Sequence, residues 1–228
     1  MVASLPVAIA GEPMQLLADR AMYWPARRRL LIADLHLGKG DAFRRGGIAL
    51  PRGGTAFDLM RLSRLVQRTD AAELWILGDV LHGAAHHSAW QATWHQWRER
   101  HAALAVAALV GNHDRALAPA GLQIEMLGEA VDDGPFALCH APQTHDALHV
   151  MCGHLHPQIV MAGLPRRWPC FWLTPRQTVL PAFSDFTGGS IVSSVFPSEH
   201  DADARFVVCG GDWLQPIGFD CDGPATAF

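Results

Sequence analysis

Carboxylate, amide and imidazole side chains follow several short apolar runs of this 228-residue sequence. These groups bind metal ions and transfer protons, so their repeated placement after apolar runs indicates a centre of chemistry. A lone histidine after a strand ordinarily has a structural role, whereas the ordered set is hard to explain in that way. In chain order the groups are Asp34 and His36 in "ADLH", Asp79 and His82 in "GDVLH", Asn112, His113 and Asp114 in "GNHD", His140 in "ALCH", and His154 and His156 in "GHLHP".

The spacing of these groups predicts a site for cations. Asp34 and His36 are two residues apart, as are His154 and His156, and in an extended chain such a pair projects to one side. Converging pairs can surround a cation. Three further donors in the set are Asp79, Asn112 and His140. One octahedral ion does not need seven donors, whereas two ions that share a bridging carboxylate do. Because no cysteine is among the donors, a structural zinc site is disfavoured.

The apolar runs that precede the polar groups have the length and composition of buried strands. In open α/β sheets, ligands bind at the carboxyl ends of the strands, which is where the polar groups lie. Strands are predicted at residues 29–34, 73–79, 103–112, 135–140, 147–154, 170–174, 178–183, 190–196 and 205–210.

Two amphipathic segments predict helices. Residues 55–68 begin with Thr55 and Asp58, which match a capping box. The buried face of this helix would consist of Phe57, Leu62, Leu65 and Val66. Residues 88–104 form the second segment, with Ser88 as its N-cap. Its stripe of tryptophans is expected in the core rather than as a stacking platform for bases, and consists of Trp90, Trp94 and Trp97.

The order of the elements predicts an α/β fold in which two sheets pack together with helices outside, because strands and helices mix first and strands dominate later. Half of the residues are hydrophobic and 18% are charged, so one domain spanning residues 1–228 is expected, with a loose tail from about residue 217. No apolar stretch approaches the ~20 residues of a membrane span. No Lys or Arg precedes Arg20, so no signal peptide is predicted. Five cysteines without a CxxC pair indicate a reducing, cytoplasmic location.

The formal net charge of −4 provides no general attraction to nucleic acid, but the charge is unevenly distributed. Residues 39–68 contain seven basic residues against two acidic ones. Such a run is ordinarily a solvated helix face, and it becomes a phosphate-binding surface only beside a site that handles phosphate. The basic residues are Lys39, Arg44, Arg45, Arg52, Arg61, Arg64 and Arg68.

The ordered motifs resemble the calcineurin-like binuclear metallophosphoesterase superfamily. Together with "YWPARRRLLIADLHLGKGDAFRRGGIALPRGGT" (23–55), "PCFWLT" and "VLPAFSDFTGG" (179–189), they look like the bacterial DNA-ligase-associated DNA-damage-response endonuclease family, from about residue 11 to residue 215. The resemblance implies a four-layer α-β-β-α sandwich, with two mixed sheets flanked by helices. It also implies a metal-dependent phosphodiesterase or endonuclease that acts on DNA in repair, alongside an ATP-dependent ligase, a nuclease-like protein and a helicase. Two divalent ions are implied, with manganese favoured over zinc or iron.

The resemblance also assigns roles to individual residues. The first metal would be bound by Asp34, His36 and His156. Asp79 would bridge both metals, and the second would be bound by Asn112, His140 and His154. His113 would act as the acid beside the scissile phosphate, oriented by Asp114. Candidate substrate-binding residues are His82, Lys39, Arg44, Arg45 and Arg52. His82 would touch either the substrate phosphate or a metal ligand, and His86 and His87 are expected on the surface.

Two other functions fit the same motifs. A phosphomonoesterase or a small-molecule (nucleotide) phosphodiesterase would use the same two-metal centre. A metal-binding repair scaffold without catalysis is disfavoured, because such scaffolds typically lose ligands or the catalytic histidine, and here all these positions are filled.

Overall fold

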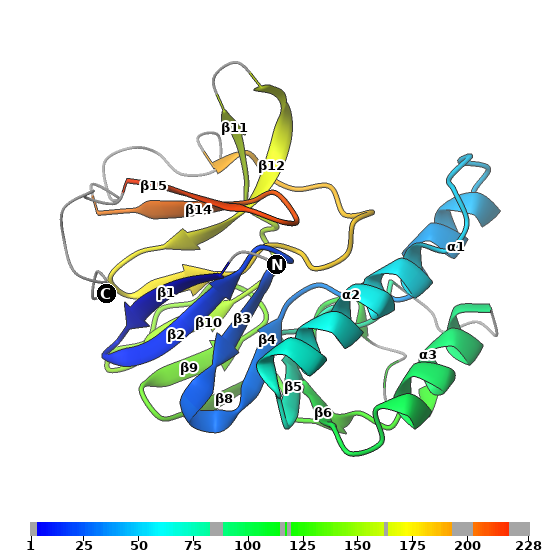
Figure 1. Ribbon diagram of the computed structural model, residues 1–228, viewed down its shortest axis with the longest axis horizontal. Helices are drawn as coiled ribbons and strands as arrows, with labels where there is room; N and C mark the ends of the chain where they lie inside the picture. The colour runs from blue at the N-terminus through cyan, green and yellow to red at the C-terminus, as the bar shows by residue number, and fades with distance from the viewer. Residues whose placement is uncertain are drawn as a thin grey trace.

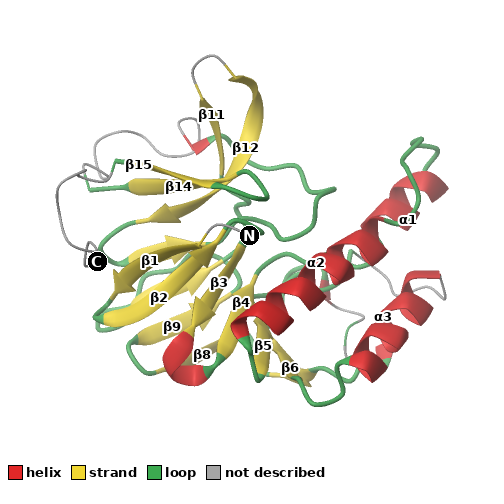
Figure 2. Ribbon diagram, viewed as in Figure 1, coloured by secondary structure: helices red, strands yellow, loops and turns green. Residues whose placement is uncertain are grey.

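The computed structural model of this protein describes residues 4–82, 89–114, 117, 120–161, 164–192 and 203–218. Its centre is a pair of β-sheets that face each other, with α-helices on the outer side of the first sheet (Figure 1, Figure 2). The seven strands of the first sheet, in spatial order, are β1 (Ser4–Ile9), β2 (Glu12–Leu17), β3 (Ala21–Trp24), β4 (Arg29–Ile32), β5 (Glu73–Ile76), β6 (Ala105–Ala108) and β7 (Glu125–Met126).

The second sheet has eight strands. Seven of them, in spatial order, are β15 (Leu214–Ile217), β14 (Arg205–Cys209), β12 (Leu164–Leu173), β13 (Gln177–Val179), β10 (His149–Cys152), β9 (Phe136–Cys139) and β8 (Ala130–Asp133). The eighth, β11 (Gln158–Met161), pairs with β12. The helices are η1 (Pro25–Arg27), α1 (Lys39–Arg45), α2 (Gly54–Thr69) and α3 (Ala89–Arg100).

Both sheets are mixed, as the family resemblance implied. In the first sheet β1 to β4 are antiparallel, whereas β4 to β7 run parallel. In the second sheet β9, β10 and β13 are parallel to one another. The prediction of two packed mixed sheets is therefore confirmed. Among the described residues the α-helices cover the first sheet only, and none of them is long and apolar enough to cross a membrane.

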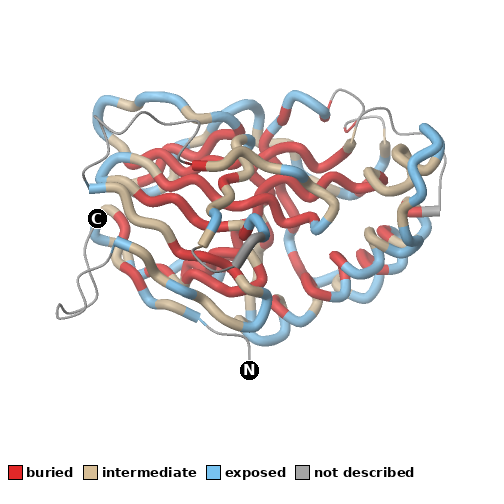
Figure 3. Tube along the Cα trace, turned by 90° about the horizontal axis from the view of Figure 1, so that it is seen from above, coloured by how far each residue is buried: buried red, intermediate tan, exposed pale blue. Residues whose placement is uncertain are grey.

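Two layers of apolar side chains hold the elements together, and Figure 3 shows the buried residues concentrated in the middle of the molecule. One layer lies between the sheets and includes Leu31, Phe136 and Phe171. The other lies between the first sheet and helices α2 and α3. It contains the tryptophan stripe, whose members Trp90, Trp94 and Trp97 are at most 6% exposed, so their predicted place in the core is confirmed.

Most predicted strands form. Several are shorter than their apolar runs, whereas β12 begins earlier than predicted and is longer. β4, β5, β6, β9 and β10 all end before the polar residues that follow them. The strands β1, β2 and β3 and the helix α1 lie in segments for which no element was predicted. The predicted strand at 190–196 does not form in its described part, where Ile191 makes only an isolated bridge to Gln158. Residues 193–196 and Ser88 lie outside the described residues, as does most of the predicted tail (219–228).

The start of α2 differs from the predicted capping box. Gly53 is its N-cap, and no side chain caps the helix. Asp58 instead points into the protein and accepts a hydrogen bond from Arg61 at 3.0 Å, so a buried ion pair takes the carboxylate away from the helix end. The predicted inward position of Phe57 is also wrong, because this ring is 46% exposed, whereas Leu62 and Leu65 are buried as expected.

Arg61 belongs to the basic run of residues 39–68 but does not contribute to the surface. It is 6% exposed, and its guanidinium also donates to the backbone oxygens of Phe183 (3.0 Å) and Asp19 (2.9 Å). It lies over the Phe183 ring at 4.4 Å. Arg61 therefore joins α2, the turn after β2 and the chain after β13.

Replacing Arg61 with Met should lower the free energy of unfolding by about 3–5 kcal/mol, because it leaves buried carboxylates uncompensated. Burial raises the pKa of Asp58 from its ordinary value to about 6, although Arg61 opposes this shift. A carboxyl whose pKa is raised by folding contributes stability at low pH that is lost as the pH rises. Without Arg61, the loss should therefore be larger at about pH 8 than at about pH 4.

Urea unfolding at both pH values tests this expectation. Arg64→Met is the matched control, because Arg64 is exposed on the same helix and should change the stability by no more than about 0.5 kcal/mol. Equal effects of the two substitutions would contradict a structural role for the Arg61 network.

Candidate metal centre

The chain segments that follow β4 and β5 are tied to each other and to the segment after β10. Backbone hydrogen bonds join Asp34 N to Gly78 O (3.2 Å) and His36 N to Asp79 O (2.9 Å). The backbone N–H of His154 donates to Asp34 Oδ2 at 3.0 Å. Because β4 and β5 belong to the first sheet and β10 to the second, the two sheets meet at these residues.

The predicted metal ligands come together in two groups. In each group, ligand atoms of all three residues lie within 4.8 Å of one another. The first group is Asp34, His36 and His156, and the second is Asp79, His140 and His154.

The two groups adjoin each other. His140 Nε2 lies 3.6 Å from Asp79 Oδ1, and His140 Nδ1 lies 4.0 Å from Asp34 Oδ1 in the other group. The seventh predicted donor is also present, since Asn112 Oδ1 lies 2.9 Å from His140 Nε2. All seven predicted donors thus share one place between the sheets.

The buried atoms of the first group fit a cation. Asp34 Oδ1, His36 Nε2 and His156 Nε2 are buried, and none has a hydrogen-bond partner among the described residues. His156 Nε2 lies only 3.3 Å from Asp34 Oδ1. A buried polar atom without a partner costs about 1–3 kcal/mol, so three such atoms facing each other need a ligand that accepts their lone pairs.

The imidazoles are oriented so that Nε2 is available. His36 Nδ1 lies 3.4 Å from Leu81 O, His140 Nδ1 lies 3.1 Å from Leu77 O, and His156 Nδ1 lies 3.0 Å from Gly188 O. A carbonyl oxygen can only accept, so the proton sits on Nδ1 and the Nε2 lone pair faces the cluster, as is usual for metal-binding histidines.

Burial keeps two of the histidines in their neutral form. It lowers the pKa of His36 to about 2, and the nearby Lys39 contributes to this shift. Burial also lowers the pKa of His154, with His140 as a second cause. Neutral imidazole is the form that binds metal ions.

The paired residues do not converge through an extended chain, as the sequence analysis assumed. Five of the clustered residues have a left-handed backbone, a conformation that is uncommon outside glycine and concentrates at functional sites. They are Asp34 (φ 55°), His36 (48°), Asp79 (48°), His154 (66°) and His156 (46°). The left-handed turns, rather than strand alternation, direct these side chains into the cluster.

Two glycines make room for this packing. A Cβ atom at Gly78, whose φ is 77°, would lie 2.3 Å from His140 Nδ1. A Cβ atom at Gly111 would lie 2.2 Å from the backbone nitrogen of Asp79. No role was predicted for these glycines from the sequence. The signal was nevertheless present, because each glycine directly precedes a predicted ligand in "GD" and "GN".

His113 lies at the open side of the cluster. Its residue is exposed, and its backbone N–H donates to Asp79 Oδ1 at 2.9 Å. Its ring centroid lies 5.7 Å from that of His36 and stacks on His82 at 5.4 Å. His82 also meets the ring of His36 edge-on at 5.6 Å, so this residue packs against both a predicted ligand and the predicted acid.

Asp114 has a different set of contacts from the one the sequence suggested. It was expected to orient His113, but its carboxylate accepts hydrogen bonds from the backbone N–H groups of Gly111 (3.0 Å), Val80 (3.2 Å) and Leu81 (2.9 Å). Asp114 therefore ties the turn after β6 to the turn after β5. It fixes the backbone that carries His113, rather than the imidazole itself.

The predicted substrate-binding residues divide into two classes. Lys39 reaches the cluster: burial lowers the pKa of its ammonium group, whereas the charges of Asp34 and Asp79 raise it. Arg44, Arg45 and Arg52 lie elsewhere. Arg44 pairs with Asp41 and donates to Pro51 O, and the other two arginines are exposed. His86 and His87 lie outside the described residues.

The segment after β13 supports the cluster, although no site residue was predicted there from the sequence. Gly188 O accepts from His156 Nδ1, and Thr187 Oγ1 accepts from Lys39 Nζ at 3.3 Å. Phe183 and Ser184 are hydrogen-bonded to the backbone beside Asp34. The glycine pair in "FTGG" was the available signal.

Comparisons with known proteins relate this chain to a family and to solved structures. Residues 27–137 match the family model described as calcineurin-like phosphoesterase. The crystal structure of nuclease MPE from Pseudomonas putida is similar to this chain, with 40% sequence identity and a TM-score of 0.80, over 93% of this chain and 100% of that chain. Yfce, a phosphoesterase from E. coli, is 14% identical with a TM-score of 0.44, over 84% of this chain and 99% of that one. A search among curated proteins gives no significant match.

The family uses a binuclear divalent metal site, and the two ligand groups of this chain provide the residues for one. The identity to the Pseudomonas putida protein extends over nearly the whole chain, including the part outside residues 27–137. This chain therefore belongs to the calcineurin-like phosphoesterase family and is a hydrolase that acts on phosphoric esters.

Proposed function

We propose that this protein is a nuclease that hydrolyses DNA phosphodiester bonds with the help of two divalent metal ions. The observation that carries the proposal is the position of the exposed His113 imidazole beside two adjoining ligand groups. The 40% identity with the nuclease from Pseudomonas putida supports a nucleic-acid substrate.

Each ligand group is assigned to one of the two metal ions. We assign Asp34, His36 and His156 to the first ion, and Asn112, His140 and His154 to the second, with Asp79 bridging both. Carboxylate and amide oxygens mixed with imidazole nitrogens favour manganese, while zinc and iron are chemically compatible. When bound, a pair of divalent ions lowers the pKa of water and stabilises the charge of a phosphoryl group.

His113 supplies the proton in this proposal. Its imidazole lies at the open side of the cluster, where it can donate to the oxygen of the departing sugar. General acid catalysis of this kind contributes about 10²–10⁴-fold to the rate. Asp114 holds the turn that carries His113, and His82 supports the ring by stacking on it. Lys39 adds positive charge for the phosphate, and the exposed Arg45 and Arg52 are candidates for contacts with the DNA backbone.

The cellular setting is also part of the proposal. We place the protein in the cytoplasm and in DNA repair, alongside an ATP-dependent ligase, a nuclease-like protein and a helicase. The cysteines support a reducing location, because all four that the structure describes are buried and free: Cys139, Cys152, Cys170 and Cys209. The association with repair partners rests on the resemblance of the flanking motifs.

The substrate can be identified with metal-stripped protein to which single divalent ions are added back. Single-stranded DNA, duplex DNA, mononucleotides and a small phosphodiester are compared under each ion. We expect DNA cleavage to return with manganese. Return of activity on mononucleotides without DNA cleavage would instead identify a phosphomonoesterase or a small-molecule phosphodiesterase.

Asp79→Ala tests the bridging role. Because a bridging carboxylate contributes to both sites, the variant should lose more than one metal equivalent per chain and essentially all hydrolysis. Metal analysis by mass spectrometry, with circular dichroism to establish folding, measures this. The His113→Ala variant is the control that should keep both ions. Two ions still bound to folded Asp79→Ala protein would refute the bridging assignment.

His113→Ala tests the acid role through the leaving group. A nitrophenolate departs without a proton, whereas the oxygen of a deoxyribose needs one. The variant should therefore lose about 10²–10⁴-fold on DNA and far less on bis(nitrophenyl) phosphate. Asn112→Ala should reduce both activities alike, because it acts through the metal. Equal losses on both substrates for His113→Ala, with both metals retained, would favour phosphate binding over proton donation.

A further inference from the structure

A pocket of about 320 Å³ lies beside the second group of metal ligands, between the turn after β6 and the chain after β9. Two predicted ligands, Asn112 and His140, line it, so the pocket is continuous with the metal centre. Sites for small ligands begin at about 300 Å³, so it can hold part of a substrate. Its other walls take no part in the chemistry proposed above and include Val110, Glu129, Cys139, Ala141, Pro142 and Gln143.

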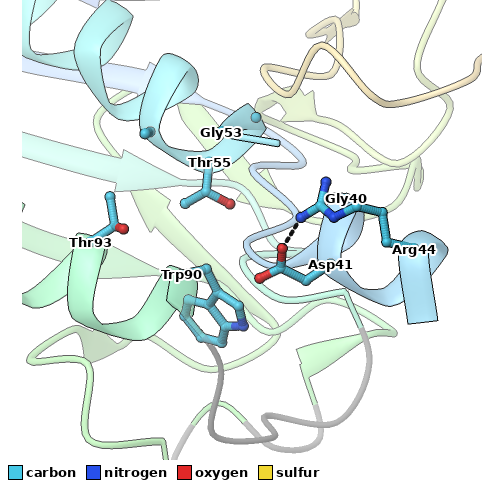
Figure 4. A pocket seen from close by; sticks show the side chains of 9 residues that line it. Gly40, Asp41, Arg44, Gly53, Thr55, Trp90 and Thr93 are labelled. Atoms are coloured by element: carbon cyan, nitrogen blue, oxygen red, sulfur yellow. Dashed lines mark hydrogen bonds and ion pairs between the residues drawn. The ribbon is translucent and has the colours of Figure 1, made fainter. Parts of the chain in front are cut away.

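The pocket shown in Figure 4 is of a different kind. It lies between the starts of α1, α2 and α3, measures only about 80 Å³, and is lined by Asp41 and Arg44 among others. The Arg44 guanidinium already donates to Asp41, as the dashed line marks, and to Pro51 O. This arginine is therefore paired within the protein, and the space beside it is too small for a nucleoside.

The walls of the pocket beside the ligands suit an uncharged group. None of the described residues that line it is Lys or Arg, whereas Glu129 contributes a carboxylate, which repels a phosphate. Val110, Ala141 and Pro142 add apolar surface, and Val110 is 36% exposed. Apolar walls with a few polar groups are typical of sites for organic ligands. The base and sugar of a nucleotide have this chemistry, and a further phosphate does not.

Two exposed polar side chains of the pocket, Glu129 and Gln143, match the edge of a base. A carboxylate only accepts hydrogen bonds, whereas an amide both donates and accepts them. In nucleic-acid recognition, carboxylates pair with the amino group of cytosine and amides pair with adenine. Thymine has no amino group, and carbonyl oxygens flank its one N–H. Glu129 therefore favours a base with an amino group over thymine.

The position of His113 indicates which nucleoside occupies the pocket. His113 is not among the described residues that line it, because its ring lies against those of His36 and His82. The pocket is lined instead by Asn112 and His140, ligands of the second group. In an in-line displacement the departing oxygen lies beside the acid. The nucleoside on the side away from His113 is therefore the one that keeps the phosphate.

We propose that this pocket binds the nucleoside that stays attached to the phosphate when DNA is cut, and that Glu129 selects a base with an amino group. The proposal deepens the nuclease function given above and rests on it. Val110 and Pro142 pack against the sugar and base, and Glu129 accepts a hydrogen bond from the amino group. Because Asn112 and His140 form one wall, a nucleoside in the pocket is close to a phosphate at the metal centre.

Phosphonates test the pocket without hydrolysis, because a methylene group replaces the ester oxygen and cannot be cleaved. The Mn²⁺-loaded wild-type protein is titrated by calorimetry with methylphosphonate, and with methylenephosphonates attached at either ester position of deoxycytidine and of thymidine. Methylphosphonate reports binding at the metal centre alone. One deoxycytidine compound should bind about tenfold tighter or more, because apolar surface is buried. Equal affinities of methylphosphonate and both deoxycytidine compounds would overturn the pocket.

Glu129→Gln distinguishes a nucleoside from a phosphate by the sign of its effect. Loss of the carboxylate should weaken the deoxycytidine compound about threefold to tenfold and change the thymidine compound less than about twofold. Glu125→Gln is the charge-matched control, since Glu125 is exposed on β7 outside the pocket. Stronger binding of every phosphonate to Glu129→Gln, or the same weakening in Glu125→Gln, would contradict the proposal.

Val110→Ser tests the apolar wall. It should weaken the deoxycytidine and thymidine compounds alike by about threefold or more, because apolar contact with the nucleoside is lost. Val160→Ser is the matched control, since Val160 is 51% exposed on β11 and does not line the pocket. Circular dichroism establishes that both variants are folded. Equal effects of the two substitutions would refute the contact with Val110.

DNA strands in which single nucleotides lack their base connect the pocket to cutting. A missing base on the side of the cut that keeps the phosphate should raise the KM of the wild-type protein, and should raise it less in Val110→Ser. If the phosphonates bind as expected but DNA is not cut, the nuclease function fails while the pocket stands as a nucleotide site. If DNA is cut and a missing base raises the KM only on the leaving side, the assignment of the pocket is wrong.

Discussion

The structure depends on a cluster of buried ligand atoms that face one another without partners. Asp34 Oδ1 and His156 Nε2 lie 3.3 Å apart at the junction of two sheets, and neither has a hydrogen-bond partner among the described residues. Such an arrangement is unfavourable in the protein alone, because burial costs each polar atom its hydration. It becomes favourable when cations accept the lone pairs. The fold around this cluster serves to hold the donors together against that cost.

The scaffold holds the donors through backbone rather than side-chain contacts. The segments after β4, β5 and β6 interlock through main-chain hydrogen bonds, and Asp114 adds three bonds to backbone N–H groups. Left-handed residues and closely packed glycines then place each ligand. Because Gly78 and Gly111 lie against His140 and Asp79, a methyl group at either position would displace a predicted ligand. The turns that carry the ligands therefore set where each ligand side chain lies.

The basic run between residues 39 and 68 illustrates how one stretch of sequence can serve separate purposes. Lys39 reaches the clustered carboxylates, Arg44 pairs with Asp41, and Arg61 is buried in an ion-pair network beneath α2. Both readings of the run, a solvated face and a phosphate-binding surface, treated it as one surface. The helices α1 and α2 direct its members to different surroundings, and burial rather than charge decides what each residue does.

Two packed sheets, the buried tryptophan stripe and the set of donors in the centre could be predicted from the sequence, because hydrophobic periodicity and polar residues at strand ends are local patterns. The tertiary structure decided the rest. Strands β1 to β3 and helix α1 depend on their neighbours in space. Asp58 does not take part in the predicted capping box, because it pairs with Arg61 inside the protein. Asp114 likewise found backbone donors in a turn more than thirty residues earlier in the chain. Contacts between residues far apart in sequence leave no periodic trace, so only the folded chain shows them.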